Sequence, residues 1–451
     1  MNTTKASHGQ WSSRFGFILA ATGSAVGLGN IWKFPYMTGV SGGSAFVLTY
    51  LLCITLIGVP ILIMEWLIGR RAQQNPIQAM EFVARQEGRS PAWKVLGFVG
   101  ILGAFLILSF YSVIGGWALD YLFLTGSGTF QGMTGKETGA VFEGFLANAG
   151  SLMLWHTVFM GLTVWIVAMG VTTGLERASR IMMPGLALVL LILVGYAAVA
   201  TDSFGRAAAF LFTPDWSAIN GQVVLAALGH AFFTLSLGMG IMTAYGAYLG
   251  KEVNLLSTAR TVVILDTTIA LMAGMAIFPL VFAHNLEPSS GPGLIFVTLP
   301  IAFGNMTGGT VLGALFFVLL SFAALTSSMS LLEPVVALVE ERTSLGRKSA
   351  AVTAGVVIWL LGVASLLSFN HWSEIQILGN NIFDFLDKLT SKFMLPLTGL
   401  GIIIFAGWFM NQEKIRQELG LEGTAYLIWS LVSRFVAPLA VIAVFISMLL
   451  G

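Results

Sequence analysis

Long apolar stretches separated by short polar segments dominate the pattern of this chain. The run from Val95 to Leu119, for example, contains no charged residue. A helix that crosses the hydrocarbon core of a bilayer needs roughly 20 mostly apolar residues. The pattern therefore predicts an all-helical integral membrane protein with eleven transmembrane helices. We expect them near residues 13–37, 42–69, 95–124, 152–173, 179–201, 217–248, 256–284, 307–340, 349–369, 380–410 and 424–449.

The composition supports a membrane protein and argues against several other classes. Of the 451 residues, 56% are hydrophobic and 10% are charged, whereas a soluble protein carries about 25% charged residues. The net charge of +1 argues against a nucleic-acid partner. The single cysteine, Cys53, allows no intrachain disulfide, and the five histidines show no zinc-site spacing. Without a catalytic constellation, linker or charge block, the chain is expected to be one membrane domain over 1–451 and not an enzyme.

Basic residues gather in alternate connections, which predicts the direction of the chain in the membrane. Cytoplasmic loops of membrane proteins carry an excess of lysine and arginine. The connections after the second, fourth, sixth, eighth and tenth predicted spans hold Arg70, Arg71, Arg85, Arg89, Lys94, Arg177, Arg180, Lys251, Arg260, Arg342, Arg347, Lys348, Lys414 and Arg416. The opposite connections hold few, such as Lys136 and Arg206. We therefore expect a cytoplasmic N-terminus, with the apolar run after Arg14 kept as the first span rather than removed as a signal peptide.

Two predicted spans contain segments that make poor helices. The first span holds GSAVGLGN at 23–30 and the sixth holds FTLSLGMG at 233–240. Glycine inside a helix costs about 1 kcal/mol relative to alanine, and backbone freed within the bilayer must be satisfied by protein, water or a ligand. The two spans are five apart, which is the layout of an inverted repeat (about 13–201 and 217–410, with an extra helix at about 424–449). Interrupted first helices in both halves mark the binding site of such transporters, although small residues also permit close helix packing.

Several motifs resemble one known family over essentially the whole chain. WSSRFGFILAATGSAVGLGNIWKFP at 11–35 is similar to the first helix of the neurotransmitter:sodium symporter family. The likeness continues through GGSAF at 42–46, EWLIGR at 65–70, FFTLSLGMG at 232–240 and LTSSMSLLEP at 325–334. Eleven spans and GMG at 238–240 resemble most the bacterial amino-acid branch of multi-hydrophobic amino acid transporters. The resemblance implies the bacterial inner (plasma) membrane and a single copy of the chain as sufficient for transport.

The resemblance implies two sodium sites. The first is similar to a site built by Ala25, Asn30, Thr234 and Asp266 and completed by the substrate carboxylate. The second is similar to a site built by Gly23, Val26, Ala323, Thr326 and Ser327. A carboxylate inside an apolar span normally marks an ion path, although Asp266 could also lie near a helix end and reach cytoplasmic water. Chloride-dependent relatives have a serine where this chain has Ala270, so we expect chloride independence.

The family's substrate pocket maps onto twelve residues of this chain. They are Ser24, Ala25, Gly27, Gly29, Ile107, Tyr111, Phe233, Thr234, Ser236, Met239, Ser327 and Leu331. Gly27 replaces the aspartate by which monoamine-carrying relatives pair with an amine, so the substrate is expected to bring its own carboxylate. The apolar lining implies leucine-like or aromatic side chains, and the adaptable Met239 implies tolerance of several sizes.

The resemblance also assigns gates on both sides of the pocket. Lys33 and Asp384 correspond to the outer charged pair, with Tyr111 and Phe233 as an aromatic lid. Lysine cannot make the bidentate contact of the arginine that is usual in the family. His230 replaces a usual glutamine and is either a core residue or a pH-sensitive gate group.

On the cytoplasmic side, Trp11 and Glu341 match the inner gate. The family usually has a basic gate residue where this chain has His8, and Lys5 is the alternative basic partner for this gate. Glu65 is expected to hold broken backbone by hydrogen bonds and to carry no ion. Gly174 and Pro184 resemble a Gly-x9-Pro motif that lets the fifth span unwind, because proline weakens a helix.

These expectations combine into a function. The chain is expected to be a sodium-coupled symporter that imports a hydrophobic or aromatic L-amino acid by alternating access. One alternative is a sodium-independent amino acid exchanger of similar architecture. A second, from another class, is a membrane substrate sensor or channel.

Overall fold

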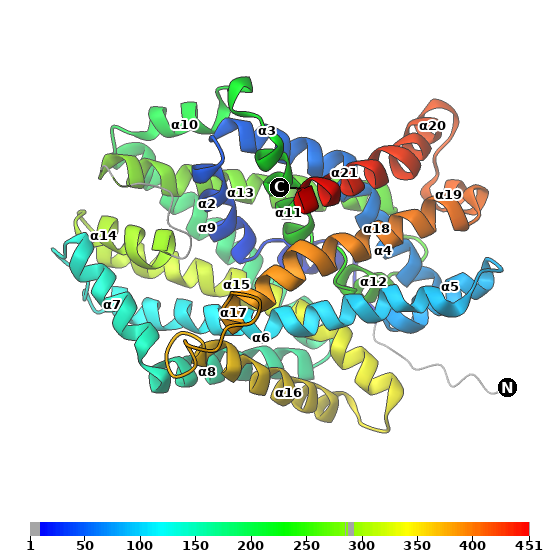
Figure 1. Cartoon of the computed structure of the whole chain (residues 1–451), viewed down its shortest axis with the longest axis horizontal. Coiled ribbons are helices and arrows are strands. Elements are labelled where there is room, and N and C mark those ends of the chain that lie inside the picture. Colours follow the sequence, from blue (N-terminus) through cyan, green and yellow to red (C-terminus); the bar gives the residue numbers. More distant parts are fainter. Residues whose placement is uncertain (1–9, 285, 287–292, 451) are drawn as a thin grey trace.

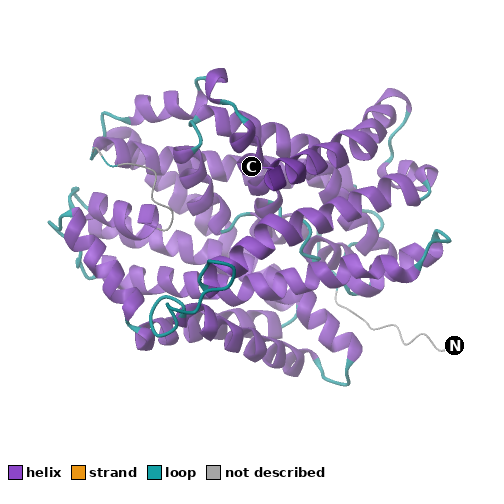
Figure 2. Ribbon diagram, viewed as in Figure 1, coloured by secondary structure: helices purple, strands orange, loops and turns teal. Residues whose placement is uncertain are grey.

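Helices account for nearly all regular structure in the protein. The computed structural model describes residues 10–284, 286 and 293–450, except for the side chains of 447–450. Within these ranges the only β-type pairing is an isolated bridge between Ile377 and Asn380. Most of the long helices run side by side along the horizontal axis of the view, joined by short loops (Figures 1 and 2). The fold class is therefore all-α, as the sequence predicts.

The helices have the following bounds. They are α1 Arg14–Ala25, α2 Phe34–Val40, α3 Ser44–Cys53, α4 Val59–Ala72, α5 Pro76–Gln86, α6 Lys94–Gly126, α7 Gly135–Ala147, α8 Ala149–Ala168, α9 Arg177–Ala200, α10 Phe204–Phe212, α11 Gly221–Thr234, α12 Ile241–Ala247, α13 Leu255–Ala283, α14 Leu299–Gly304, α15 Gly309–Arg342, α16 Arg347–Leu367, α17 Ile382–Lys388, α18 Leu395–Ile404, α19 Gln412–Leu419, α20 Gly423–Leu431 and α21 Ala437–Leu450. Seven π-helical turns join or extend them: Gly29–Lys33, Ile54–Gly58, Val171–Glu176, Leu294–Thr298, Leu389–Met394, Phe405–Phe409 and Val432–Val436. Two 3₁₀ turns, Pro91–Trp93 and Trp216–Ala218, complete the set.

Within the described residues, nine helical segments are long and apolar enough to cross a membrane. They are Ser44–Ala72, Pro91–Gly126, Ala149–Ala168, Val171–Ala200, Leu255–Ala283, Gly309–Arg342, Arg347–Leu367, Ile382–Phe409 and Gly423–Ile446. A tenth span results if Arg14–Ala25 and Gly29–Val40, which are bent by 48°, count as one. The predicted stretch at 217–248 is divided between α11 and α12, neither of which is long enough alone.

The predicted spans omit several shorter helices of the connections. The helices α5, α7, α10, α14 and α19 all lie in segments that the hydropathy pattern treats as loops. Polar caps define some of their starts: the Asn75 side chain accepts from the backbone of Ile77 and Gln78 at α5. At α7, Thr134 and Glu137 form a reciprocal capping box. Such caps are readable in the sequence, whereas a search for apolar runs does not register them.

The long helices α6 and α15 form the centre of the bundle. They pack extensively against each other, and α6 also packs against α8 and α16. The broken first span contacts the same centre, because α1 packs against α9, α13 and α15. This arrangement places the broken backbone of the first span beside the middle of α15 and of α6, inside the protein rather than against lipid.

Candidate functional site

The first break separates α1 from the π-helical turn at Gly29–Lys33. The helix ends at Ala25, and the cap residue Val26 is extended, with a φ of −78° and a ψ of 100°. The Asn30 side chain returns to the break, because its Oδ1 accepts from the backbone N–H of Gly27 at 3.2 Å. The Tyr111 hydroxyl accepts from the backbone N–H of Leu28 at 3.3 Å. Two freed donors within the bundle are thus satisfied by side chains, as buried backbone requires.

The second break extends from Leu235 to Gly240, between α11 and α12. Three of its residues adopt a positive φ: Ser236 at 53°, Gly238 at 73° and Gly240 at 71°. This region favours glycine, and a serine there is a strained residue held by its surroundings. Glu65 holds the break as the sequence predicts, since its Oε1 accepts from the backbone N–H of Gly238 at 2.7 Å. The prediction that Glu65 holds broken backbone by hydrogen bonding is therefore confirmed.

The two breaks are tied to each other by serine hydroxyls. Ser236 Oγ donates to the backbone carbonyl of Ser24 at 3.0 Å, and the two hydroxyl oxygens lie 3.2 Å apart. All of these atoms are buried. Backbone carbonyls and hydroxyls from both breaks therefore converge at one point in the interior.

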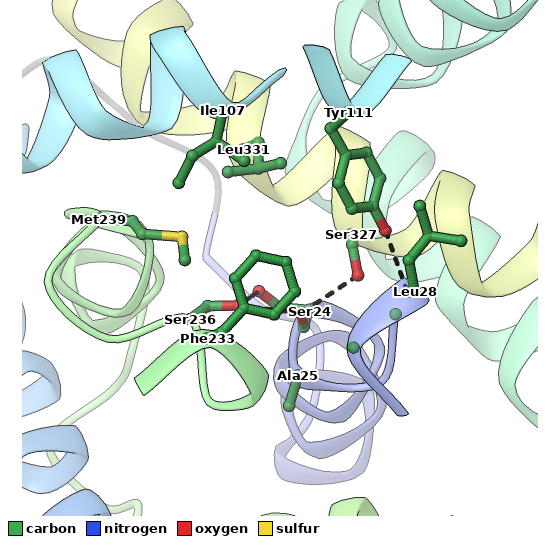
Figure 3. Close-up of a pocket in the computed structure, with 12 residues that line it drawn as sticks. Ser24, Ala25, Leu28, Ile107, Tyr111, Phe233, Ser236, Met239, Ser327 and Leu331 are labelled. Carbon is green, nitrogen blue, oxygen red and sulfur yellow. Dashed lines mark hydrogen bonds between the residues drawn. The ribbon is translucent and has the colours of Figure 1, made fainter. Parts of the chain in front are cut away.

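A pocket lies where the breaks meet α6 and α15, and its empty volume is about 310 Å³ (Figure 3). Its lining residues are Ser24, Ala25, Gly27, Leu28, Gly29, Ile107, Tyr111, Phe233, Ser236, Met239, Ser327 and Leu331. Figure 3 shows Ile107 and Met239 reaching it from different elements, with the Phe233 ring beside Ser236. All predicted substrate residues except Thr234 lie in this lining, and Leu28 is an additional member.

Neither Gly27 nor Gly29 leaves room for a side chain. A Cβ on Gly27 would overlap Ser327 Oγ and lie 3.0 Å from the Tyr111 hydroxyl oxygen. A Cβ on Gly29 would lie 3.2 Å from the Phe233 ring. The glycines of the first break therefore allow side chains of α6, α11 and α15 to approach its backbone closely.

Thr234 belongs instead to a cluster with Asn30 around Asp266. Together with Ala25, which the resemblance assigns to the same sodium site, these residues are called here the Asp266 cluster. Thr234 Oγ1 donates to Asp266 Oδ1 at 3.0 Å and lies 3.2 Å from Asn30 Oδ1. Asn30 Nδ2 donates to Asp266 Oδ1 at 2.8 Å. Ala25 is the member that lines the pocket itself. The structure thus brings three predicted side-chain ligands of the first sodium site within direct contact.

Asp266 is fully buried, which excludes the alternative that it reaches cytoplasmic water. The hydroxyl of Tyr50, in α3, donates to Asp266 Oδ2 at 3.0 Å. Tyr50 is not predictable from the sequence, because no spacing within one span indicates which residue of another span will face a carboxylate. An ionised carboxylate in such a site needs compensation by hydrogen bonds and positive charge.

The second predicted set also converges, in what we call the Thr326 cluster: Gly23, Val26, Ala323, Thr326 and Ser327. Thr326 Oγ1 lies 3.4 Å from the Val26 carbonyl oxygen and 3.0 Å from that of Ala323. Ser327 Oγ lies 3.5 Å from the carbonyl oxygen of Gly23. The cluster contains oxygen atoms of two hydroxyls and three backbone carbonyls, and it carries no formal charge.

The donor sets of both clusters suit a hard cation. Hard cations such as Ca²⁺ and Mg²⁺ take carboxylate, carbonyl and hydroxyl oxygens, and both clusters are composed of these. Among the described residues, no group of three or more His, Cys, Asp or Glu is arranged to hold a metal ion. A transition-metal site of that kind is therefore not offered by this part of the chain, whereas neutral oxygens with a single carboxylate fit a monovalent cation.

The predicted outer gate residues, Lys33 and Asp384, do not pair with each other in the part of the chain that the structure describes. Lys33 Nζ lies 4.3 Å above the Phe233 ring, and no ion pair joins Lys33 to Asp384 in the described structure. Asp384 instead stands in the first turn of α17, where its backbone N–H donates to Asn381. Lys33 also lines a larger cavity, with an empty volume of about 1200 Å³, between α2, α11, α18 and α21.

His230 borders the same cavity and is buried in an aromatic enclosure. Its ring lies 5.1 Å from Tyr50, 5.7 Å from Phe34 and 5.9 Å from Phe46, measured between ring centroids. Neither ring nitrogen has a hydrogen-bond partner among the described residues. Both alternatives for His230, a core residue or a pH-sensitive gate group, stay predictions.

The predicted inner gate residues are anchored separately. Trp11 Nε1 donates to the Tyr245 carbonyl at 3.1 Å. Glu341 accepts from the backbone and side chain of Asn75, at 2.8 and 2.5 Å. His8 and Lys5, the predicted basic partners, lie outside the described residues. Asn75 is a contact that the sequence analysis did not anticipate, although its position as an N-cap was readable.

The fifth span begins with a π-helical turn, and the unwinding that its Gly-x9-Pro spacing implies stays a prediction. Residues Val171–Glu176 form a π-helical turn that follows Gly170, whose φ is +98°. A Cβ on Gly174 would overlap the carbonyl oxygen of Ile166. Pro184 lies inside α9.

The fold and the site together define a membrane protein whose two broken helices enclose a pocket. Its sequence matches the profile of the sodium:neurotransmitter symporter family at residues 8–131 and 140–451. The sodium-dependent transporter YhdH of Bacillus subtilis is 38% identical, over 98% of this chain and 97% of that protein. A sodium-dependent transporter of Haemophilus influenzae is 34% identical, over 99% of both chains. The crystal structure of MhsT in complex with L-phenylalanine is 47% identical, with a TM-score of 0.90 over 98% of this chain and 99% of that one.

The chain therefore belongs to the sodium:neurotransmitter symporter family. Members of this family are transporters and not enzymes, so the chain is a sodium-dependent membrane transporter. The resemblance inferred from the motifs is confirmed.

Proposed function

We propose that this protein is a sodium-coupled symporter that imports a hydrophobic or aromatic L-amino acid by alternating access. The observation that carries the proposal is the position of the pocket between two oxygen clusters. Gly27, which lines the pocket, donates its backbone N–H to Asn30 of the Asp266 cluster, and Ser327 belongs to both the pocket and the Thr326 cluster. Because Asn30 in turn donates to Asp266 Oδ1, a substrate carboxylate at this side of the pocket is proposed to share a cation with Asp266. Substrate and sodium then stabilise each other's binding, which is the linkage that coupling requires.

The pocket lining supports the proposed substrate class. Its side-chain wall is mostly apolar, with Ile107, Met239 and Leu331 as the aliphatic members. No lysine, arginine, aspartate or glutamate lines it, so a zwitterion must meet hydroxyls, backbone and a bound cation. We propose that the Tyr111 hydroxyl contacts the substrate carboxylate and that Ser236 Oγ contacts the ammonium group; both residues line the pocket. The phenylalanine bound to MhsT is of the same chemical class.

Asp266 also supports chloride independence. A fully buried carboxylate beside the first proposed cation supplies a fixed negative charge, so a mobile anion is not needed to balance that cation. Ala270, one helical turn further along α13, is buried and offers no hydroxyl to an anion. The fixed charge of Asp266 and the missing hydroxyl at Ala270 both support chloride independence.

We further propose eleven spans in one domain, with α11 and α12 together forming the sixth. Spans one to five and six to ten would then be the two inverted repeats, and Gly423–Ile446 the extra helix. The distribution of basic residues supports a cytoplasmic N-terminus, and the bacterial relatives support the plasma membrane. A single copy encloses the whole pocket, which supports transport by a monomer.

The proposal is tested by uptake into proteoliposomes that contain the purified protein. Each of the twenty L-amino acids is supplied with an inward sodium gradient, with equal sodium on both sides, and with potassium in place of sodium. We expect concentrative uptake of apolar or aromatic amino acids under the gradient alone, and the same uptake when gluconate replaces chloride. Exchange that proceeds equally well in potassium would establish the sodium-independent exchanger instead.

A further inference from the structure

A contact outside the pocket holds the wall that Met239 forms. Met239 lies between Gly238 and Gly240, both of which have a positive φ, and Figure 3 shows its side chain reaching the pocket. Ile107 lines the pocket from α6. The same helix meets the backbone of residues 238–240 at Gly100, which lies two turns before Ile107 on α6. The spacing between α6 and this segment therefore governs the separation of two pocket walls.

At Gly100 the segment approaches so closely that an added Cβ would crowd its backbone. A Cβ there would lie 3.0 Å from the backbone nitrogen of Gly240, 3.3 Å from the carbonyl oxygen of Gly238 and 3.3 Å from the carbonyl carbon of Met239. All three are backbone atoms, so none can rotate away as a side chain does. Gly100 is not among the residues with a positive φ. Its glycine is thus needed for close approach and not for an unusual backbone conformation.

We propose that Gly100 is a specificity-determining residue that sets the size of the substrate pocket without lining it. A methyl group at Gly100 acts as a wedge between α6 and residues 238–240. Because Ile107 is fixed to α6 and Met239 to the segment, the wedge separates these two walls and widens the pocket. The inference rests on the proposed function, since it concerns which amino acids the pocket accepts.

Gly103, one turn further along α6, supplies a matched control. A Cβ on Gly103 would lie 3.7 Å from Leu395 Cδ1 and 3.8 Å from Met394 Cε, both ordinary contacts with side chains. It touches no atom of residues 238–240 within 4 Å. Gly100→Ala and Gly103→Ala therefore make the same chemical change in the same helix, with the same gain in helix propensity. Only the first inserts a wedge behind Met239.

The experiment measures sodium-dependent uptake of tryptophan and valine by proteoliposomes of the wild type, Gly100→Ala and Gly103→Ala. We expect the ratio of tryptophan to valine uptake efficiency to rise at least about threefold in Gly100→Ala, a small part of the discrimination that one methylene can give. Gly103→Ala should keep the wild-type ratio. On a Met239→Ala background, Gly100→Ala should change the ratio little, because the two sites act through one wall.

The outcomes separate this inference from the proposed function. If the wild type shows no sodium-dependent uptake of any amino acid, the proposed function is wrong. If the wild type transports but Gly100→Ala leaves the ratio unchanged or lowers it, only the role of Gly100 is overturned. Recovery of folded Gly103→Ala but not of Gly100→Ala would assign Gly100 to stability alone and would equally overturn it.

Discussion

The two oxygen clusters beside the pocket contain different kinds of oxygen atoms. The Asp266 cluster combines side chains of three different helices with one fully buried carboxylate, whereas the Thr326 cluster is neutral and uses mostly backbone carbonyls. A buried charge needs a partner far more than a buried carbonyl does. We therefore expect sodium binding at the Asp266 cluster to depend on the charge of Asp266. Sodium binding at the Thr326 cluster should depend instead on the exact path of the broken backbone. Substitutions can separate these two dependences.

Removal of the charge at Asp266 should have the largest effect. Asp266→Ala removes the carboxylate and leaves the donors of Asn30, Thr234 and Tyr50 without their acceptor, and a charge-assisted hydrogen bond contributes about 1.5–3 kcal/mol. We expect the sodium concentration for half-maximal uptake to rise by at least about tenfold, since 1.4 kcal/mol corresponds to a factor of ten. Sodium titrations of amino acid uptake measure this directly. Asp266→Asn, which keeps the shape but not the charge, should behave like Asp266→Ala, and an unchanged titration would remove Asp266 from the proposed site.

Loss of one hydroxyl from the neutral cluster should cost less. Thr326→Val keeps the shape of the side chain but deletes Oγ1, which lies beside the carbonyls of Val26 and Ala323. One neutral polar interaction contributes about 1 kcal/mol, so we expect a rise of roughly fivefold in the half-maximal sodium concentration. Thr326→Ser retains the hydroxyl and serves as the control. Equal titrations for the valine and serine variants would count against a cation at this cluster.

Much of this architecture was predictable, and the reason differs between elements. Apolar length alone indicates spans such as Val95–Leu119, because a helix that crosses the lipid core must be mostly apolar along its whole length. Glycine and hydroxyl content indicates both breaks, since neither suits a regular helix within a bilayer. The positions of Ser24, Asn30 and Thr326 came from the family resemblance and not from any local pattern.

What could not be predicted depends on contacts between distant spans. Tyr50 lies 216 positions from Asp266 along the chain, yet it donates to that carboxylate. The sequence around Gly100 does not show that residues 238–240 pack against this glycine. The absence of an ion pair between Lys33 and Asp384 among the described residues likewise depends on how α2 and α17 stand relative to each other. Sequence spacing within one helix carries no information of this kind.

Tyr50 sharpens the comparison because it touches the charged cluster from outside the predicted ligand set. Tyr50→Phe keeps the ring that packs between Phe34 and His230 but removes the hydroxyl that donates to Asp266 Oδ2. We expect the half-maximal sodium concentration to rise by about twofold to threefold. This hydrogen bond to a carboxylate contributes about 1.5–3 kcal/mol, but it forms with and without sodium, so only the difference between the two states affects sodium binding. Sodium titrations of uptake by Tyr50→Phe and Asp266→Ala, measured side by side, show how large the change is relative to loss of the carboxylate. A loss as large as that of Asp266→Ala would make Tyr50 a member of the cluster itself.

Glu65 offers the smallest expected effect and the sharpest contrast with Asp266. Both carboxylates are fully buried beside a break, but Glu65 accepts from the backbone of Gly238 and from Thr243, and not from a proposed sodium ligand. Glutamine at this position keeps an oxygen for Gly238 N–H, so Glu65→Gln should leave the half-maximal sodium concentration within about twofold of the wild type, as expected when a hydrogen bond is kept. Glu65→Ala, which removes that acceptor, should lower the maximal uptake rate instead, because residues 235–240 lose their anchor. A shift in sodium titration for Glu65→Gln as large as that for Asp266→Asn would mean that burial beside a break, and not contact with the cluster, makes a carboxylate part of the sodium site.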